Sequence, residues 1–76
     1  MKTLLLQVIR SLVDNPEDVR IAEVVGAQTV IFEVRCHAND IGKIIGRNGR
    51  TINALRGLAE ALGMRRRLKV VLEVVE

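Results

Sequence analysis

The sequence predicts a single α+β domain in which three amphipathic helices cover one face of a three-stranded mixed sheet. The first observation is size, because 76 residues are enough for one small domain. The second is composition, since 49% of the residues are apolar, too many for a disordered chain. The third is the order of apolar patterns along the chain, which reads helix, strand, strand, helix, helix, strand. We therefore expect one domain over residues 1–76.

The first element is an amphipathic helix. Leucine, isoleucine and valine recur at intervals of three and four from Leu4 to Val13, which is typical of a helix with one buried face. Thr3 is the expected N-cap. The pair Asn15-Pro16 is expected to end the helix, because the residue before a proline avoids the helical conformation.

A hairpin follows this helix. Residues 19–25 are short and β-branched, residues 26–28 supply a turn, and residues 29–36 alternate between apolar and polar side chains. The alternation predicts one buried face on the second strand, formed by Val30, Phe32, Val34 and Cys36.

The second half of the chain predicts two helices and a last strand. Asp40 is expected to cap a short helix over residues 41–45, which residues 46–49 interrupt. A longer helix begins at about Arg50, and Gly63 is its expected C-terminal cap. Its inward residues are Ile52, Leu55, Leu58, Ala59 and Leu62. Residues 68–75 form the last strand, and the two-helix connection before it predicts that strands two and three are parallel.

Positive charge is concentrated in the second half. Residues 35–69 contain nine basic and two acidic residues, a balance of +7, although the net charge of the chain is only +3. A basic half of this kind is the electrostatic pattern of a polyanion-binding protein. Charge alone leaves open a second interpretation, a solvated basic surface without a partner.

The sequence predicts a cytoplasmic location without membrane contact. No segment approaches the roughly 20 apolar residues that span a bilayer. Residues 1–6 resemble the start of a signal peptide, but the apolar run stops at Gln7. The single cysteine, Cys36, cannot form a disulfide within the chain, in agreement with a reducing compartment.

No enzyme, metal site or cofactor is expected. Cys36 and His37 are adjacent, but neighbouring strand residues point to opposite faces and no second Cys/His pair exists. Cys36 also lacks a base and an orienting group that would make it a nucleophile. Asp14, Glu17 and Asp18 surround a turn, where capping or solvation explains them better than acid–base chemistry.

The segment between the two later helices carries the chemistry. Residues 41–52 read Ile-Gly-Lys-Ile-Ile-Gly-Arg-Asn-Gly-Arg-Thr-Ile. Gly46 and Gly49 let the backbone turn sharply and approach a ligand closely. The free amides at the start of the next helix, together with Arg47, Asn48 and Arg50, are suited to binding consecutive phosphates.

This loop is neither a Walker loop nor a dinucleotide fingerprint. The spacing is G-x-x-x-G-x-x-G, no Lys-Ser/Thr pair follows the last glycine, and the loop joins two helices. A tight turn that needs glycine for purely structural reasons is the alternative. The basic loop residues, the flanking isoleucines Ile45 and Ile52, and the order of elements favour a phosphate-binding loop.

The motif over residues 45–52 resembles the core of K-homology (KH) domains, whose G-x-x-G loop clamps about four nucleotides of a single strand. The order of elements is similar to the type II, prokaryotic arrangement of that fold. The resemblance covers essentially all 76 residues. In the opening helix and in residues 12–18 the chain is similar to the small bacterial single-KH proteins of the KhpA family.

The resemblance implies roles for the residues of the motif. Gly46, Arg47, Asn48 and Gly49 would contact the RNA backbone, and Lys43 and Arg50 would be flanking phosphate contacts. An apolar groove that receives bases would be lined or supported by Gly42, Ile44, Ile45 and Ile52. Arg65, Arg66 and Arg67 extend the basic surface or form a solvated turn, and the sequence leaves both interpretations open.

The resemblance also implies partners. These are single-stranded RNA, a second copy of the chain, and a larger KH-containing protein of the KhpB/Jag type, and the implied role is that of an RNA chaperone or post-transcriptional regulator. Because Phe32 is the only aromatic residue, binding without base stacking should be weak and tolerant of sequence. A dimer would raise the avidity. The rival hypothesis is an interaction module that mainly dimerises with a KH partner and contacts RNA little.

Overall fold

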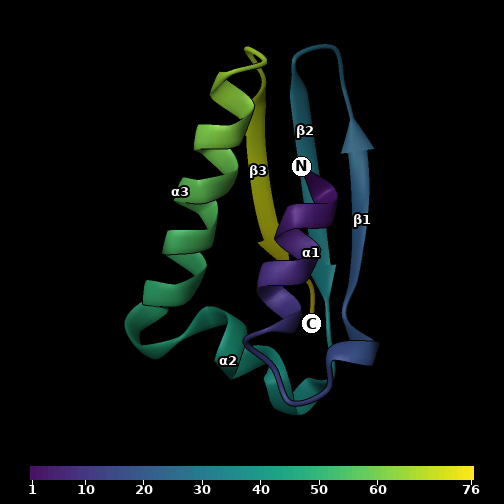
Figure 1. Ribbon diagram of the computed structural model, residues 1–76, viewed down its shortest axis with the longest axis vertical. Helices are drawn as coiled ribbons and strands as arrows, with labels where there is room; N and C mark the ends of the chain where they lie inside the picture. Colours follow the sequence, from purple (N-terminus) through teal and green to yellow (C-terminus); the bar gives the residue numbers. More distant parts are fainter.

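The computed structural model describes residues 1–76 as three α-helices and three strands, joined in part by short 3₁₀ helices (Figure 1). The α-helices are α1 (Lys2–Arg10), α2 (Ile41–Ile45) and α3 (Arg50–Met64), and the strands are β1 (Arg20–Val25), β2 (Thr29–Arg35) and β3 (Lys69–Val74). The 3₁₀ helices are η1 (Pro16–Asp18), η2 (Ala38–Asp40) and η3 (Arg47–Gly49). The predicted α+β class and order of elements are confirmed. None of the helices has the length and apolar character needed to cross a bilayer.

The sheet is mixed, with β2 in the centre. β1 pairs with β2 antiparallel, with Ile21 opposite Val34, and β3 pairs with β2 parallel, with Phe32 opposite Leu72. The amide of Gly26 donates a 2.7 Å hydrogen bond to the carbonyl of Thr29 and closes the hairpin turn. The predicted hairpin and the parallel pairing across the two-helix connection are both confirmed.

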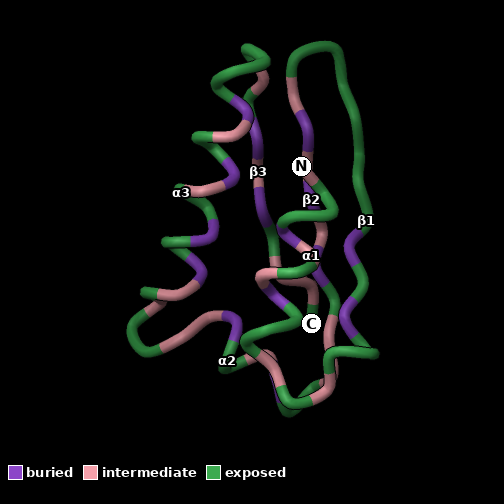
Figure 2. Tube along the Cα trace, viewed as in Figure 1, coloured by how far each residue is buried: buried purple, intermediate pink, exposed green.

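The core lies between the helices and one face of the sheet. Contacts join α3 to β3, α1 to β1 and α2 to α3, and in Figure 2 the buried positions of α3 face the sheet while the hairpin end of β1 is exposed. Phe32 is completely buried, as the alternation predicted. The core comprises thirteen apolar residues: Leu5, Ile9, Val19, Ile21, Val30, Phe32, Val34, Ile44, Ile52, Leu55, Ala59, Val70 and Leu72.

The ends of α1 differ from the prediction. The helix begins after Met1 without a side-chain cap, so the expected role of Thr3 as N-cap is wrong. It ends at Arg10, well before Pro16, and the amides of Ser11 and Leu12 close a tighter turn on the carbonyls of Val8 and Ile9. Further along, the amides of Asp14 and Asn15 donate to the carboxylate of Asp40 instead of to helical carbonyls. Pro16 occupies the first position of η1, where its missing N–H is not needed.

Gly63 does not cap α3, contrary to the prediction. It lies inside the helix and is buried, and a Cβ atom there would be 2.3 Å from Cγ2 of Val70 and 2.8 Å from the carbonyl oxygen of Leu68. The helix ends instead in a Schellman motif, in which the amide of Leu68 donates to Gly63 and that of Arg67 to Met64. Arg67 takes the left-handed position with φ 56°. Gly63 is therefore required for close packing of α3 on β3.

Candidate nucleic-acid interface

The G-x-x-G segment forms a tight turn between α2 and α3, as predicted. Gly46 ends α2 with φ 77°, and its amide donates a 2.8 Å hydrogen bond to the carbonyl of Gly42. Gly49 has φ 73°, and its amide donates to the carbonyl of Gly46 at 3.1 Å. Asn48 has φ 57°, a left-handed conformation that asparagine tolerates better than most residues. The backbone of this turn thus depends on glycine at both ends.

Gly46 is also required for space. A Cβ atom at this position would lie 2.2 Å from Oγ1 and 2.9 Å from the amide nitrogen of Thr51. At Gly49 the nearest atoms, on Asn53 and Ile52, would be 3.8 and 3.9 Å away. The turn therefore packs tightly against the first turn of α3 at Gly46, whereas at Gly49 an added Cβ atom would make only ordinary van der Waals contacts.

The turn offers positive groups without a carboxylate. The amides of Arg47 and Asn48, both exposed residues, are the first of η3 and have no acceptor within that 3₁₀ turn. The N-cap of α3 is Gly49, which has no side chain to cap the free amides, and the first turn contains no acidic residue. A helix N-terminus carries roughly half a positive charge, and the exposed side chains of Arg47 and Arg50 add full charges. This arrangement is suited to binding anions.

The four predicted groove residues lie in different environments. Ile44 is completely buried and Ile52 is 6% exposed, so both belong to the core beneath the turn. Ile45 is half-buried, and Gly42 is exposed with open space around it. In this structure Ile44 and Ile52 support the turn, whereas Ile45 and Gly42 leave surface accessible to a ligand.

Asp40 does not cap α2 with its side chain, contrary to the prediction. Its fully buried carboxylate accepts hydrogen bonds from the amide of Asp14 (3.2 Å) and from the amide and side chain of Asn15 (2.9 and 3.0 Å). Burial raises the pKa of the Asp40 carboxyl. The hydrogen bonds from Asn15 and Asp14 and the charge of Lys43 outweigh that effect, so the pKa lies below its ordinary value. Asp40 therefore ties the end of the α1–η1 connection to the start of α2.

Lys43, a predicted phosphate contact, is engaged within the protein. Its Nζ atom lies 3.0 Å from Oδ2 of Asp14, and the two side chains are 46% and 75% exposed. The hydrogen bond and the negative charge of Asp14 raise the pKa of the Lys43 ammonium. No pattern in the sequence indicates this pair, because the two residues are brought together only by the fold.

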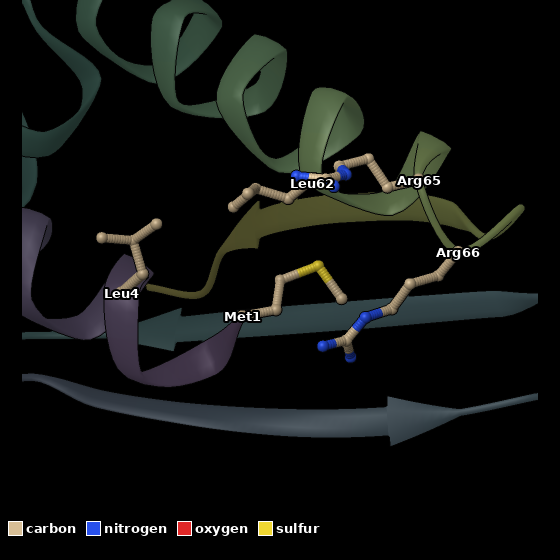
Figure 3. Close-up of a pocket in the computed structure, with 5 residues that line it drawn as sticks. All are labelled: Met1, Leu4, Leu62, Arg65 and Arg66. Atoms are coloured by element: carbon tan, nitrogen blue, oxygen red, sulfur yellow. The ribbon is translucent and has the colours of Figure 1, made fainter.

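The three arginines Arg65–Arg67 lie at the opposite end of α3 from the glycine turn. A helix of this length places its ends about 20 Å apart. Arg65 and Arg66 border an open hollow of about 400 Å³ whose other lining residues are Met1, Leu4 and Leu62. In Figure 3 the side chain of Arg66 extends toward Met1. These arginines therefore belong to a different surface from that of the turn.

A second groove, which the sequence did not reveal, runs between α3 and the free edge of β3. It has a volume of about 330 Å³ and is lined by Arg56, Glu60 and residues 69–73. Nε of Arg56 donates a 3.2 Å hydrogen bond to the carbonyl of Leu72, whereas the amide of Lys69 donates toward the β2 side, to Gln28. Since backbone groups alternate in direction along a strand, Val70 and Leu72 present their polar backbone groups to this groove. Recognising the last strand as a sheet edge would have been the signal.

Cys36 and His37 take separate structural roles. Nδ1 of His37 accepts a 3.0 Å hydrogen bond from the amide of Asn39 and caps η2. Cys36 is a half-buried free thiol, and burial, with a smaller effect of Asp40, raises its pKa. No three His, Cys, Asp or Glu side chains converge as a metal site would require.

Comparison with known proteins gives consistent matches over the whole chain. The family model described as the KH domain of KhpA/KhpB matches residues 2–74. The RNA-binding protein KhpA of Chlamydia pneumoniae is 49% identical over 76 residues, which cover 100% of this chain and 97% of that protein. The RNA-binding protein KhpA of Clostridium perfringens is 40% identical over 75 residues, covering 99% and 100%. No solved structure was found to match the chain.

Proposed function

The chain belongs to the KhpA/KhpB family of KH domains, and on this premise we propose that it binds single-stranded RNA by clamping the RNA backbone with its G-x-x-G turn. Its relatives in Chlamydia and Clostridium are RNA-binding proteins by name. The observation that carries the proposal is the turn itself. Between Gly46 and Gly49 lie two exposed residues whose backbone amides have no acceptor within η3. They lie beside the N-terminus of α3, which no side chain caps.

The turn binds the phosphates. The amides of Arg47 and Asn48 donate to phosphate oxygens, and the positive end of α3 stabilises the same charges. The guanidinium groups of Arg47 and Arg50 add charge-assisted contacts on either side. A G-x-x-G loop holds about four nucleotides, so three or four phosphates lie within reach of these groups.

The bases lie in the groove between α3 and β3. Val70 directs its backbone amide and carbonyl into this groove, where base edges can form hydrogen bonds with them. The carbonyl of Leu72 already accepts from Arg56, so Leu72 offers its amide. No aromatic ring is available for stacking, because Phe32 is completely buried. Binding by backbone contacts and charge is therefore weak for one domain and tolerant of sequence, which suits an RNA chaperone or post-transcriptional regulator that acts on many transcripts in the cytoplasm.

Two clamps acting together compensate for the weakness of one. We place the chain in a homodimer, or in a complex with a KhpB/Jag-type KH protein, because linked sites gain avidity without new contacts. Large apolar side chains at the surface support a protein interface, since Leu4, Leu12 and Met64 are 42%, 39% and 75% exposed. An interaction module that contacts RNA little is the rival function, and it needs this interface but not the glycine turn.

The double substitution Arg47→Asp and Asn48→Asp tests the clamp. It places two carboxylates where phosphates would lie, so the affinity for a ten-nucleotide single-stranded RNA should fall at least about tenfold. The matched control, Lys2→Asp with Gln7→Asp, changes the net charge by the same amount on exposed positions of α1 and should have a much smaller effect. Fluorescence anisotropy with labelled RNA measures affinity, and circular dichroism and sedimentation measure folding and dimerisation.

The salt dependence of the same titration is a second readout. Contacts with three or four phosphates predict a slope of log affinity against log salt of about −2 to −3, at roughly 0.7 per phosphate. If the double variant binds RNA as the natural chain does, with folding and dimerisation intact, the clamp is wrong and the interaction module stands.

A further inference from the structure

The α1–η1 connection is fixed against α2 by a buried charge. Asp40 immediately precedes α2, and its carboxylate accepts the amides of Asp14 and Asn15 and the side-chain amide of Asn15. No buried side-chain polar atom in the structure lacks a partner, so this site is fully satisfied. The backbone of Asp14 is therefore held in place by a residue 26 positions away in the sequence.

From this fixed backbone the side chain of Asp14 reaches Lys43. The 3.0 Å pair between them is the one ion pair of the structure. An ordinary surface ion pair is weak partly because two mobile side chains must be ordered. Here the hydrogen bond from the amide of Asp14 to Asp40 fixes the backbone of one partner, which favours formation of the pair.

Lys43 also belongs to the charges around the glycine turn. It lies on α2, three residues before Gly46, whereas Arg47 and Arg50 on the other side of that glycine make no ion pair. A carboxylate thus pairs with one of the three cations closest in sequence to the turn.

We propose that Asp14, whose backbone is held by Asp40, competes with RNA for Lys43 and thereby lowers the affinity of the glycine turn for RNA. This inference rests on the proposed RNA binding. An RNA phosphate that reaches Lys43 must displace the carboxylate of Asp14, and the freed carboxylate then remains near the RNA as a repelling charge. Asp14 acts through Lys43 and is therefore a tuning residue, not part of the clamp.

The substitution Asp14→Asn tests this proposal. It removes the charge but keeps the backbone amide that donates to Asp40. Because the side chain of Asp14 is 75% exposed, the substitution leaves the packing of the core unchanged. The matched control is Asp18→Asn, an exposed residue that forms no ion pair and gives the same change in net charge. The probe is a ten-nucleotide polyuridine RNA, titrated by anisotropy at several salt concentrations.

We expect Asp14→Asn to bind this RNA about 1.5- to 5-fold more tightly than Asp18→Asn at low salt, the range that a surface ion pair spans. The slope of log affinity against log salt should steepen by about 0.7, because Lys43 becomes available to one more phosphate. In a Lys43→Gln background, both aspartate variants should behave alike, since no ammonium remains for which to compete.

Two results would overturn the proposal. The first is equal affinity and salt slope for Asp14→Asn and Asp18→Asn, and the second is an advantage of Asp14→Asn that persists in the Lys43→Gln background. Absence of RNA binding by the natural chain would instead refute the proposed function. The failure of the competitor and the failure of the clamp are therefore distinguishable in one set of titrations.

Discussion

The two ends of α3 carry similar charge in opposite electrostatic settings. At the N-terminus, Arg47 and Arg50 lie at the positive end of the helix dipole, without an acidic residue or a side-chain cap. At the C-terminus, Arg65–Arg67 lie at the negative end, where cations stabilise a helix. Each such charge contributes about 0.3–1 kcal/mol, unfavourable at the first end and favourable at the second. The helix dipole thus favours the basic C-terminus and opposes the basic N-terminus.

The two ends of α3 also use glycine for different purposes. The N-terminal turn places Gly46 and Gly49 where φ is positive. At the C-terminal turn the positive φ is taken by Arg67, and the nearby Gly63 is used for packing against Val70. Glycine thus serves a left-handed turn at one end, where Gly46 is also closely packed, and close packing alone at the other.

The largest effects should come from filling these two glycines. Gly46→Ala and Gly63→Ala each push a Cβ atom into backbone or a packed side chain, so each should lower the free energy of unfolding by about 1–3 kcal/mol. Of the two variants, only Gly46→Ala should also lower the affinity of the folded protein for RNA. Urea unfolding followed by circular dichroism, with RNA titration by anisotropy, separates the two.

Gly57→Ala is the matched control for the glycine pair. Gly57 lies within α3 with nothing within 4 Å of an added Cβ atom, so alanine there should stabilise the protein by about 0.5–1 kcal/mol. If Gly63→Ala weakened RNA binding of the folded protein as much as Gly46→Ala, the functional distinction between the two ends would be lost.

Charge reversal should give smaller effects of opposite sign. Arg50→Glu puts an acidic residue in the first turn of α3 and should raise the free energy of unfolding by roughly 1 kcal/mol, whereas Arg65→Glu should lower it by a similar amount. RNA affinity should not follow stability: it should fall about tenfold or more for the more stable Arg50→Glu, and much less for the less stable Arg65→Glu. Thermal unfolding and RNA titration of both variants check this. An equal loss of affinity would mean that the RNA surface extends along the whole helix.

Local patterns predicted most of the fold. The alternation in residues 29–36 placed Phe32 in the core, the two-helix connection gave the parallel pairing of β2 and β3, and the glycine spacing located the turn. These features depend on neighbours in sequence or on general rules of connection, so the sequence contains enough information to predict them.

The sequence did not predict the contacts between residues that lie far apart along the chain. Asp40 accepts the amides of the segment that follows α1, and Val70, across the helix–sheet interface, leaves no room for a side chain at Gly63. The ion pair of Lys43 with Asp14 and the groove beside β3 likewise require the assembled fold. A single sequence shows the type of each residue, but not which distant group it will meet.

The buried carboxylate of Asp40 makes the joint between α1 and α2 sensitive to acid. Because the pKa of Asp40 in the folded state lies below its ordinary value, its ionised form stabilises the protein above that ordinary value, and this contribution is lost as the pH falls through the folded-state pKa. Urea unfolding across acidic pH should show this loss, and Asp40→Asn should flatten it. If Asp40→Asn lost stability in acid as the natural chain does, carboxylates other than Asp40 would govern acid unfolding. Protonation of Asp40 would loosen the attachment of α2, the helix that leads into the glycine turn, while the turn itself contains no group that titrates in acid.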